Sequence, residues 1–291
     1  FAVVEALSAS GANLYAGGSF TNFGGQLANG IARWNGTRWS ALESGVRFSS
    51  SLDRFPRVNA LAATSSGVYV GGAFDRAGNL PANGIAFWNG QTWASLEGPT
   101  GNGVDGEVNA ITLDGPLVYV GGGFTQAGGV AANNIARWSG AWSSLGTGPA
   151  NGVSSSFGQS IEVVTGLAVA DGNLYAVGPF DTAGGRPANG FASWNGSNWT
   201  GYGVDVPAQY LRAVLADNSS VYTGGSQLSQ SPVAILQSTS ATGDAANAPS
   251  RNSSVARNGY RIAFQSEASN LVAGDGNGRA DVFVRDPSSQ T

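Results

Sequence analysis

The sequence repeats one phrase at intervals of about fifty residues, and this repetition limits the possible folds more than any other feature. The stretch "LYAGGSFTNFGGQLANGIARWNGTRWSAL" at 14–42 returns in altered form along the chain. A period of this length is typical of one β-propeller blade. The tyrosines that mark the units are Tyr15, Tyr69, Tyr119, Tyr175 and Tyr222. The paired tryptophans of the first four units are Trp34 and Trp39, Trp88 and Trp93, Trp138 and Trp142, and Trp194 and Trp199.

Residues 58–98 show how one unit divides into strands. The segments "VNALAA", "VYVGGAF", "GIAFW" and "TWASLE" are short and apolar, and they contain the β-branched and aromatic residues that favour strands. A Ser-Ser-Gly step, a loop rich in Gly, Asn and Pro, and an Asn-Gly step separate these segments. The Asn-Gly step predicts a hairpin with a type I′ turn, in which both central residues take a positive φ. Four antiparallel strands of this kind make one propeller blade.

The composition favours the same all-β class. The chain has 291 residues, of which 42% are hydrophobic, and this is ample for a buried core. Its 45 glycines and its low charged fraction of 11% favour strands and tight turns over solvated helices. We therefore expect a single all-β domain, a β-propeller of about six four-stranded antiparallel blades, with five or seven blades as alternatives.

Glycine pairs interrupt the second expected strand of three units. Glycine weakens a strand, so we expect neighbouring backbones to come close at these pairs, where the blades converge on the propeller axis. We expect the tryptophans to fill the space between blades, each burying about 200 Å², and a row of phenylalanines to lie in the core. The glycine pairs are Gly17 and Gly18, Gly71 and Gly72, and Gly121 and Gly122. The phenylalanines are Phe20, Phe74, Phe124 and Phe180.

The pattern "YVGGxFxxAGxxxANxIAxWNG" resembles the repeats of secreted bacterial and fungal propellers related to the kelch and galactose-oxidase group and to the Rax2-like cortical marker family. The resemblance covers residues 4–203 and implies a propeller fold that serves both oxidase chemistry and protein binding. The copper oxidase activity would need His and Cys ligands, and the chain contains neither. The units expected here are 4–44, 58–98, 108–146 and 163–203.

The repeat changes toward the C-terminal end of the sequence. Residues 210–237 form a degenerate unit that keeps two strands and the pair Gly224 and Gly225 but lacks the tryptophans. Residues 254–291 resemble the WD40-like repeat of TolB-type propellers, and the matching residues are Gly259, Ala263, Phe264, Asp281, Phe283, Val284 and Asp286. This last blade is incomplete, because it lacks a fourth strand. The N-terminal "FAVVEALS", residues beyond 291 or a neighbouring molecule would cover its unpaired edge.

The missing residue types exclude several kinds of chemistry. The chain has no Cys, His or Met, and every basic residue is an arginine. Ser-His-Asp and Cys-His nucleophile pairs, thiolate or imidazole zinc sites and disulfides are therefore excluded. The net charge of −4 and the scattered arginines offer no basic stripe for nucleic acid. No apolar stretch is long enough for a transmembrane helix, so we expect no membrane insertion.

One loop has the residue types of a calcium site. In "GDGNGRADVF", Asp275, Asn277 and Asp281 place oxygen ligands along a Gly-rich turn, and Ca²⁺ prefers such hard oxygens. The alternative is an Asx-turn in which Asp281 begins a strand. Calcium is therefore the one candidate cofactor, and no other cofactor is expected.

The repeated loops carry candidate ligand contacts and candidate acids. Recurring asparagines on one rim could present amides to sugar hydroxyls, or each could bond its own loop backbone. Asp75 and Asp181 stand where other units have threonine, which favours a turn cap over a general acid. Glu107 and Glu162 occur once each and stay open as catalytic acids of a glycoside hydrolase or lyase. The rim asparagines are Asn29, Asn83, Asn133 and Asn189.

These observations favour a non-enzymatic propeller. The chain opens "FAVVEALSAS", without an initiator Met, so a signal peptide has been removed or the chain begins mid-protein. We expect an exported bacterial protein, extracellular or on the cell surface, that acts as a structural or adhesive scaffold. Its partners would be copies of itself, added strand to strand at the open blade edge into a filament or sheath, or surface proteins and glycans. A carbohydrate-binding, lectin-like propeller is the alternative, and a glycoside hydrolase or lyase is the third reading.

Overall fold

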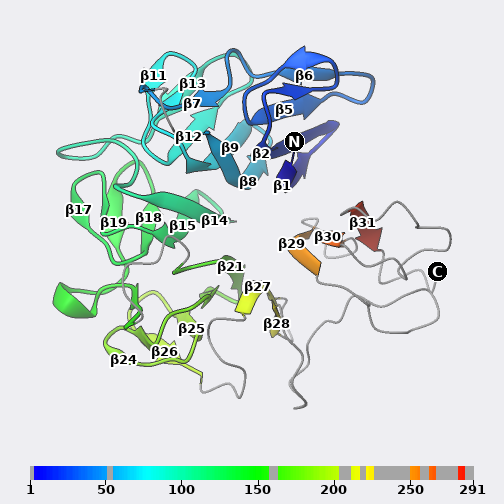
Figure 1. Cartoon of the computed structure of the whole chain (residues 1–291). Coiled ribbons are helices and arrows are strands. Elements are labelled where there is room, and N and C mark those ends of the chain that lie inside the picture. Colours follow the sequence, from blue (N-terminus) through cyan, green and yellow to red (C-terminus); the bar gives the residue numbers. More distant parts are fainter. Residues whose placement is uncertain are drawn as a thin grey trace.

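The computed structural model describes residues 3–50, 55–156, 163–202, 211–216, 221–225, 250–255, 262–266 and 281–285. These residues form antiparallel strands, and one 3₁₀ turn occurs at Gly148–Ala150. Six radial sheets surround a common axis, which Figure 1 shows nearly end on. The predicted fold class, an all-β propeller, is confirmed.

Four blades have four strands each, and in each the chain runs from the innermost strand outward. Blade 1 contains β1 (Val3–Ser10), β2 (Asn13–Ser19), β5 (Ile31–Trp34) and β6 (Trp39–Ala41). Blade 2 contains β8 (Arg57–Thr64), β9 (Gly67–Ala73), β12 (Ile85–Trp88) and β13 (Trp93–Ser95). Blade 3 contains β14 (Glu107–Asp114), β15 (Leu117–Gly123), β18 (Ile135–Trp138) and β19 (Trp142–Ser144). Blade 4 contains β21 (Gly166–Ala170), β22 (Asn173–Val177), β25 (Phe191–Trp194) and β26 (Trp199–Gly201).

The last two blades are smaller in the part of the chain that the structure describes. Blade 5 contains β27 (Leu211–Ala216) and β28 (Val221–Gly225), and blade 6 contains β29 (Ser250–Val255), β30 (Ile262–Ser266) and β31 (Asp281–Arg285). Strand β29 lies beside β27 and β1, so the innermost strands of the six sheets close a ring (Figure 1). The N-terminal segment does not complete the last blade. That alternative is wrong, because β1 pairs with β2 as the inner strand of blade 1.

Short strands in the loops join consecutive blades. After its outermost strand, the chain crosses over and pairs with a hairpin of the next blade. In this way β7 (Val46–Arg47) pairs with the hairpin β10 (Arg76–Ala77) and β11 (Leu80–Pro81). Likewise β20 (Val153–Ser154) pairs with β23 (Thr182–Ala183), which continues into β24 (Arg186–Pro187). The matching hairpins of blades 1 and 3 are β3 (Asn22–Phe23) with β4 (Gln26–Leu27), and β16 (Gln126–Ala127) with β17 (Val130–Ala131).

The two glycines of each pair have different neighbours. A methyl group at Gly71 would lie 2.4 Å from Cγ1 of Val108, which belongs to the inner strand of the next blade. A methyl group at Gly72 would lie 2.0 Å from the carbonyl oxygen of Arg57, beside a β-bulge of its own blade. The predicted close approach is therefore present. It involves a side chain of the next blade and a bulge of the same blade, and in blade 3 also the backbone of the next blade, because the amide of Val164 donates to the oxygen of Gly122 at 3.1 Å.

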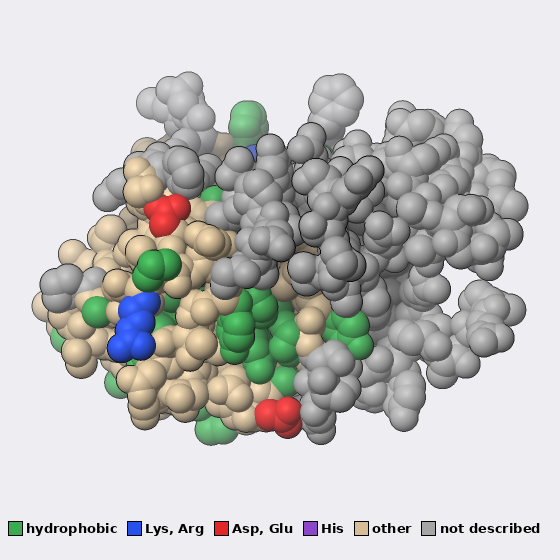
Figure 2. Space-filling view, turned by 90° about the horizontal axis from the view of Figure 1, so that it is seen from below, with side chains coloured by type: hydrophobic (Ala, Val, Ile, Leu, Met, Phe, Trp, Pro, Cys, Tyr) green, Lys and Arg blue, Asp and Glu red, His purple; other side chains and the backbone are tan. Residues whose placement is uncertain are grey.

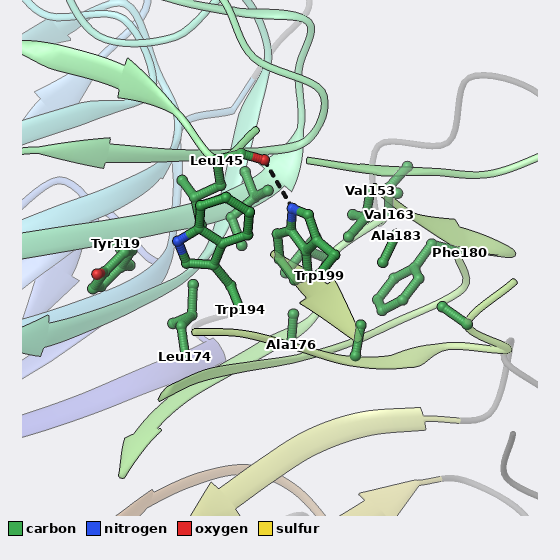
Figure 3. Close-up of a cluster of buried hydrophobic side chains, with 14 residues drawn as sticks. Tyr119, Leu145, Val153, Val163, Leu174, Ala176, Phe180, Ala183, Trp194 and Trp199 are labelled. Atoms are coloured by element: carbon green, nitrogen blue, oxygen red, sulfur yellow. Dashed lines mark hydrogen bonds between the residues drawn. The ribbon is translucent and has the colours of Figure 1, made fainter. Parts of the chain in front are cut away.

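In blades 2 to 4, the second tryptophan joins its blade to the blade before it. The indole Nε1 of Trp93, Trp142 and Trp199 donates to the backbone oxygen of Leu42, Leu96 and Leu145, at 3.2, 2.9 and 2.8 Å. All three indoles are only 5% exposed. Figure 3 shows Trp199 between blades 3 and 4, with its hydrogen bond to Leu145. The predicted placement of these tryptophans between blades is confirmed.

The hairpins that follow the first tryptophan of each unit are present, but their turn type differs from the prediction. In the loop between Trp34 and Trp39, Gly36 has a φ of +96°, whereas Asn35 and Thr37 do not have a positive φ. A positive φ at the first central residue alone is the pattern of a type II′ turn. The oxygen Oδ1 of Asn35 accepts hydrogen bonds from the amides of Thr37 and Arg38, at 3.1 and 3.0 Å. The asparagine therefore acts through its side chain rather than through its backbone conformation.

Candidate functional site

The loops between the second and third strands lie at the same end of the sheets as the crossovers between blades, because neighbouring strands are antiparallel. We call this end the crossover rim. It contains the hairpins β3–β4, β10–β11, β16–β17 and β23–β24, the predicted rim asparagines and three aspartates. The longer loops of the described part lie at this rim, and binding and catalytic residues are found mainly on such loops.

The rim asparagines hold the crossovers in place. The amide Nδ2 of Asn29 donates to the oxygen of Ser44 at 2.8 Å, and that of Asn83 donates to the oxygen of Asn102 at 3.4 Å. The backbone amide of Asn133 donates to Oδ1 of Asn151 at 2.9 Å. The side chains of Asn29 and Asn83 thus bond the backbone of the crossover rather than that of their own loop.

The backbone conformation of the fourth rim asparagine explains why asparagine suits this position. Asn189, like Asn29, has a positive φ, which asparagine tolerates better than most residues. The backbone amide of Asn189 donates a hydrogen bond to the backbone oxygen of Asp181 at 3.4 Å. Sugar binding by the four amides stays a prediction.

The rim aspartates connect neighbouring blades. Asp75 accepts two hydrogen bonds from Ser49, one from the backbone amide and one from the hydroxyl, both at 2.6 Å. Asp105 accepts from the amides of Thr125 and Gln126 at 2.7 and 2.8 Å. In each case the carboxylate and its donors belong to a crossover and to the hairpin that this crossover meets. The same connection is thus made in both directions. Asp75 belongs to the hairpin and its donor to the crossover, whereas Asp105 belongs to the crossover and its donors to the hairpin.

Asp181 makes the corresponding tie between blades 3 and 4, where its Oδ2 accepts from the amide of Ser156 at 2.5 Å. Of the two acids left open as catalytic groups, Glu107 begins β14 and is partly buried. Glu162 lies outside the described residues. A catalytic role for either stays a prediction.

The inner strands bring a further set of polar residues to the axis. A bulge shifts the register between Val4 and Ala6 in β1, and at the matching place in β8, β14 and β27. In each strand the register skips one residue at this bulge, at the end nearest the crossover rim. The residues at these bulges are Glu5, Asn59, Asn109 and Arg212. Because these strands surround the axis, the bulges form a polar ring at its mouth.

Contacts between neighbouring members fix part of this polar ring. The amide Nδ2 of Asn59 donates to Oδ1 of Asn109 at 2.9 Å. In blade 4, the matching Thr165 donates its hydroxyl to the oxygen of Leu211 in blade 5, at 3.1 Å. Sequence analysis missed this ring. The available signal was a variable residue between a constant aliphatic residue and a constant small residue, where the rest of the repeat hardly changes.

The described part of the structure does not include the side chains of the proposed calcium ligands. Asp275 and Asn277 lie outside the described residues, and of Asp281 the structure describes only its place at the start of β31. Elsewhere in the described part, no three acids gather closely enough to hold a metal ion. No described helix is long and apolar enough to cross a bilayer. Calcium binding at 275–281 stays a prediction.

Comparison with known proteins supports the fold. No protein-family profile and no curated protein matches the sequence significantly. Among solved structures, the extracellular domain of a hybrid two-component system from B. thetaiotaomicron matches 99% of this chain, with a TM-score of 0.50 and 13% identity. This chain spans 34% of that protein's length. At this identity the likeness shows the fold alone.

Two further solved structures match this chain at lower similarity. A GH74 enzyme from Niastella koreensis matches 80% of this chain at 15% identity, with a TM-score of 0.48, and this chain covers 36% of it. YCF48 bound to D1 peptide matches 100% of this chain at 13% identity, with a TM-score of 0.34, and this chain covers 67% of it. The propeller class is supported by the radial sheets and by the likeness to the extracellular domain, and the kelch-like and TolB-like resemblance of the repeats stays a prediction.

Proposed function

We propose that this chain is an exported, non-catalytic propeller that acts as a rigid structural or adhesive scaffold. The proposal is supported by the hydrogen bonds of the repeated polar groups, which go to the protein's own loops. Asp75, Asp105 and Asp181 each accept hydrogen bonds across a blade boundary, and the side chains of Asn29 and Asn83 donate to the backbone of a crossover. Groups held in this way stiffen the disc and are poorly placed to exchange protons with a substrate.

The extracellular location is part of the proposal. The sparse charge and the absence of Cys and Lys suit an exported protein that needs neither disulfides nor a charged surface. The similar propeller from B. thetaiotaomicron is itself an extracellular domain. Surface proteins and glycans would be the partners of such a scaffold, together with further copies of the chain.

Fractionation and adhesion assays test this function. Cells that express the protein should carry it on the surface or release it, and purified protein on beads should bind those cells. Retention inside the cell would overturn the proposal. Hydrolysis of a polysaccharide panel by purified protein would also overturn it, if the activity is lost in Glu107→Gln.

Self-assembly is the narrower form of the proposal. Among the described strands, β31 pairs only with β30, so its outer edge can receive a strand from another copy. We expect concentration-dependent growth beyond the monomer in sedimentation velocity, and filaments by negative-stain microscopy. A monomer at the highest soluble concentration would rule out self-assembly and leave the adhesive scaffold standing.

A further inference from the structure

The face that blade 4 turns toward blade 5 differs from the matching faces of blades 1 to 3. Residues paired across neighbouring strands point to the same face, so each blade presents rows of side chains to its successor. One row consists of Gly17, Ile31 and Leu42 in blade 1, and of Gly121, Ile135 and Leu145 in blade 3. In blade 4 the same row is Val177, Phe191 and Tyr202, so every member is larger.

The enlarged row forms an aromatic stack. The rings of Phe191 and Tyr202 lie 4.6 Å apart at an interplanar angle of 26°, and Tyr175 lies 6.3 Å from Phe191. Tyr202 is 37% exposed, whereas the leucines at its position in blades 1 to 3 are buried. One side of Tyr202 is therefore covered by Phe191, and part of the residue is open to solvent.

The position of Tyr202 is fixed by hydrogen bonds. Its backbone amide donates to the oxygen of Phe191 at 2.9 Å, and its hydroxyl lies 3.0 Å from the hydroxyl of Ser193. Ser193 is buried, and its cross-strand partner Thr200 is exposed. The stack is thus a rigid aromatic surface with hydroxyl groups at its edge.

A second row on the same face consists of Tyr175, Ser193 and Thr200. Neither row contains a charged residue. Ser193 stands where blade 1 has Arg33 and blade 3 has Arg137, each of which lies beside the tyrosine of its own blade. Figure 2, which views the molecule from below, shows hydrophobic side chains gathered in the middle of the described surface, with an acidic side chain at their lower edge. The two rows are therefore aromatic, hydroxylated and uncharged, and the carboxylate of Asp171 lies near Tyr175 at their edge.

We propose that the Phe191–Tyr202 stack is a binding site for an uncharged saccharide. One face of a pyranose ring is lined by C–H groups that pack on an aromatic ring, while its hydroxyls need donors and acceptors beside that ring. An open ring of Tyr202 beside Ser193 and Thr200 offers both. An acidic saccharide would find no arginine here, which selects neutral sugars over uronic acids. The inference rests on the proposed adhesive function and gives it a ligand class.

Substitutions that restore the repeat's own residues test the site. Tyr202→Leu and Phe191→Ile place the residues of blades 1 to 3 into blade 4, so the fold should tolerate them. We would titrate purified wild-type protein with cellohexaose, mannohexaose and chitohexaose by calorimetry. We expect binding of at least one probe, a loss of about tenfold or more in Tyr202→Leu, and a smaller loss in Tyr202→Phe, which keeps the ring.

Matched controls locate the binding. Leu27→Ala removes an apolar side chain that is 63% exposed on blade 1, and it should bind as the wild type does. Failure of the wild type to bind any probe, or undiminished binding by Tyr202→Leu, would overturn the inference. A dimer that Tyr202→Leu dissociates would overturn it in favour of a second copy as the occupant. Because purified protein is used, these outcomes do not depend on export or adhesion, which test the proposed function separately.

Discussion

The boundaries between blades 1, 2, 3 and 4 are built alike, and the boundary between blades 4 and 5 is built differently. In the first group, a glycine admits an aliphatic side chain of the next blade, and an indole of the later blade bonds a leucine oxygen of the earlier one. Blade 4 has Val177 at the glycine position and Tyr202 at the leucine position. The same backbone plan thus supports a closely packed boundary and an aromatic surface.

Blade 1 is modified on its opposite face. Phe23 stands where blades 2 to 4 have the buried alanines Ala77, Ala127 and Ala183, each paired with a valine from the preceding crossover. The ring of Phe23 lies 4.6 Å from that of Trp39, edge to face. Blade 1 therefore covers its own tryptophan, where later blades use the crossover of their predecessor. The first four blades form a module with an aromatic residue at each end.

The largest expected effect concerns the inter-blade indoles. Trp142→Ala should lower the free energy of unfolding by about 3–5 kcal/mol, because it removes a buried aromatic ring and leaves the oxygen of Leu96 without its donor. Trp39→Ala should cost about half as much, because Trp39 is partly exposed and bonds no described leucine oxygen. Denaturant unfolding followed by the remaining tryptophan fluorescence measures both. Equal losses would show that the inter-blade hydrogen bond contributes nothing.

The next largest effect concerns the glycine that faces an aliphatic side chain of the next blade. At Gly121, an added methyl would lie 2.4 Å from Cγ1 of Val164, so Gly121→Ala should destabilise by about 1–3 kcal/mol. At Gly224, the matching position in blade 5, no described atom lies within 4 Å, and Gly224→Ala should be nearly neutral. Adding Val164→Ala to Gly121→Ala should recover part of the loss. A double-mutant cycle without coupling would contradict the proposed contact.

Blade 4 already contains a natural version of that compensation. Val177 fills the glycine position, and the inner strand has Gly166 where the other inner strands have alanine. A methyl group at Gly166 would lie 2.9 Å from Cγ2 of Val177. The small residue has therefore moved from the second strand to the first, which keeps the packed volume similar.

A smaller effect is expected at the crossover rim. Asp105→Ala removes the acceptor for the amides of Thr125 and Gln126, and we expect a loss of about 1 kcal/mol, because the carboxylate is exposed. Hydrogen exchange of those two amides should accelerate, while exchange in the inner strands stays unchanged. Asp105→Asn keeps one acceptor oxygen and should give an intermediate rate. Unchanged exchange in Asp105→Ala would show that the tie does not hold the hairpin.

The sequence predicted the fold well, because the repeat combines strand periodicity with turn residues at fixed offsets. Four strands in a unit, the buried phenylalanines and the tryptophans between blades all follow from it. The type I′ turn was wrong, since an Asn-Gly pair also fits a turn in which only the glycine has a positive φ. The N-terminal latch was wrong because an apolar strand shows no preference between an inner and an outer place.

The candidate sites were harder to predict. A residue that recurs in every unit attracts attention, yet Asn29 and Asn83 recur because a loop needs them. The polar ring and the Phe191–Tyr202 stack occur where the repeat changes, and a change alone does not show which face a residue occupies. Strand register supplies that information, because it places Val177 opposite Phe191 on one face.

The smallest effect is a gradual loss of stability at alkaline pH. Burial raises the pKa of Tyr15, Tyr69, Tyr119 and Tyr175 above the ordinary value of about 10, although Arg137 partly offsets the shift for Tyr119. The unfolded chain therefore ionises first. The stability that these hydroxyls contribute is complete below about pH 10 and is lost as the pH rises through the raised values.

Melting temperatures measured from pH 8 to pH 11 test this and compare the two kinds of boundary. Tyr119 lies between blades 3 and 4, and Tyr175 lies on the aromatic face of blade 4, where the neighbouring Asp171 and Tyr202 add to the upward shift of its pKa. Tyr119→Phe and Tyr175→Phe should each flatten the decline above pH 10 and leave the melting temperature at pH 8 nearly unchanged. Phenylalanine keeps the ring in place and removes only the group that titrates. A decline of the same steepness in both variants and in the wild type would therefore show that ionisation of these hydroxyls does not limit the stability of either boundary at alkaline pH.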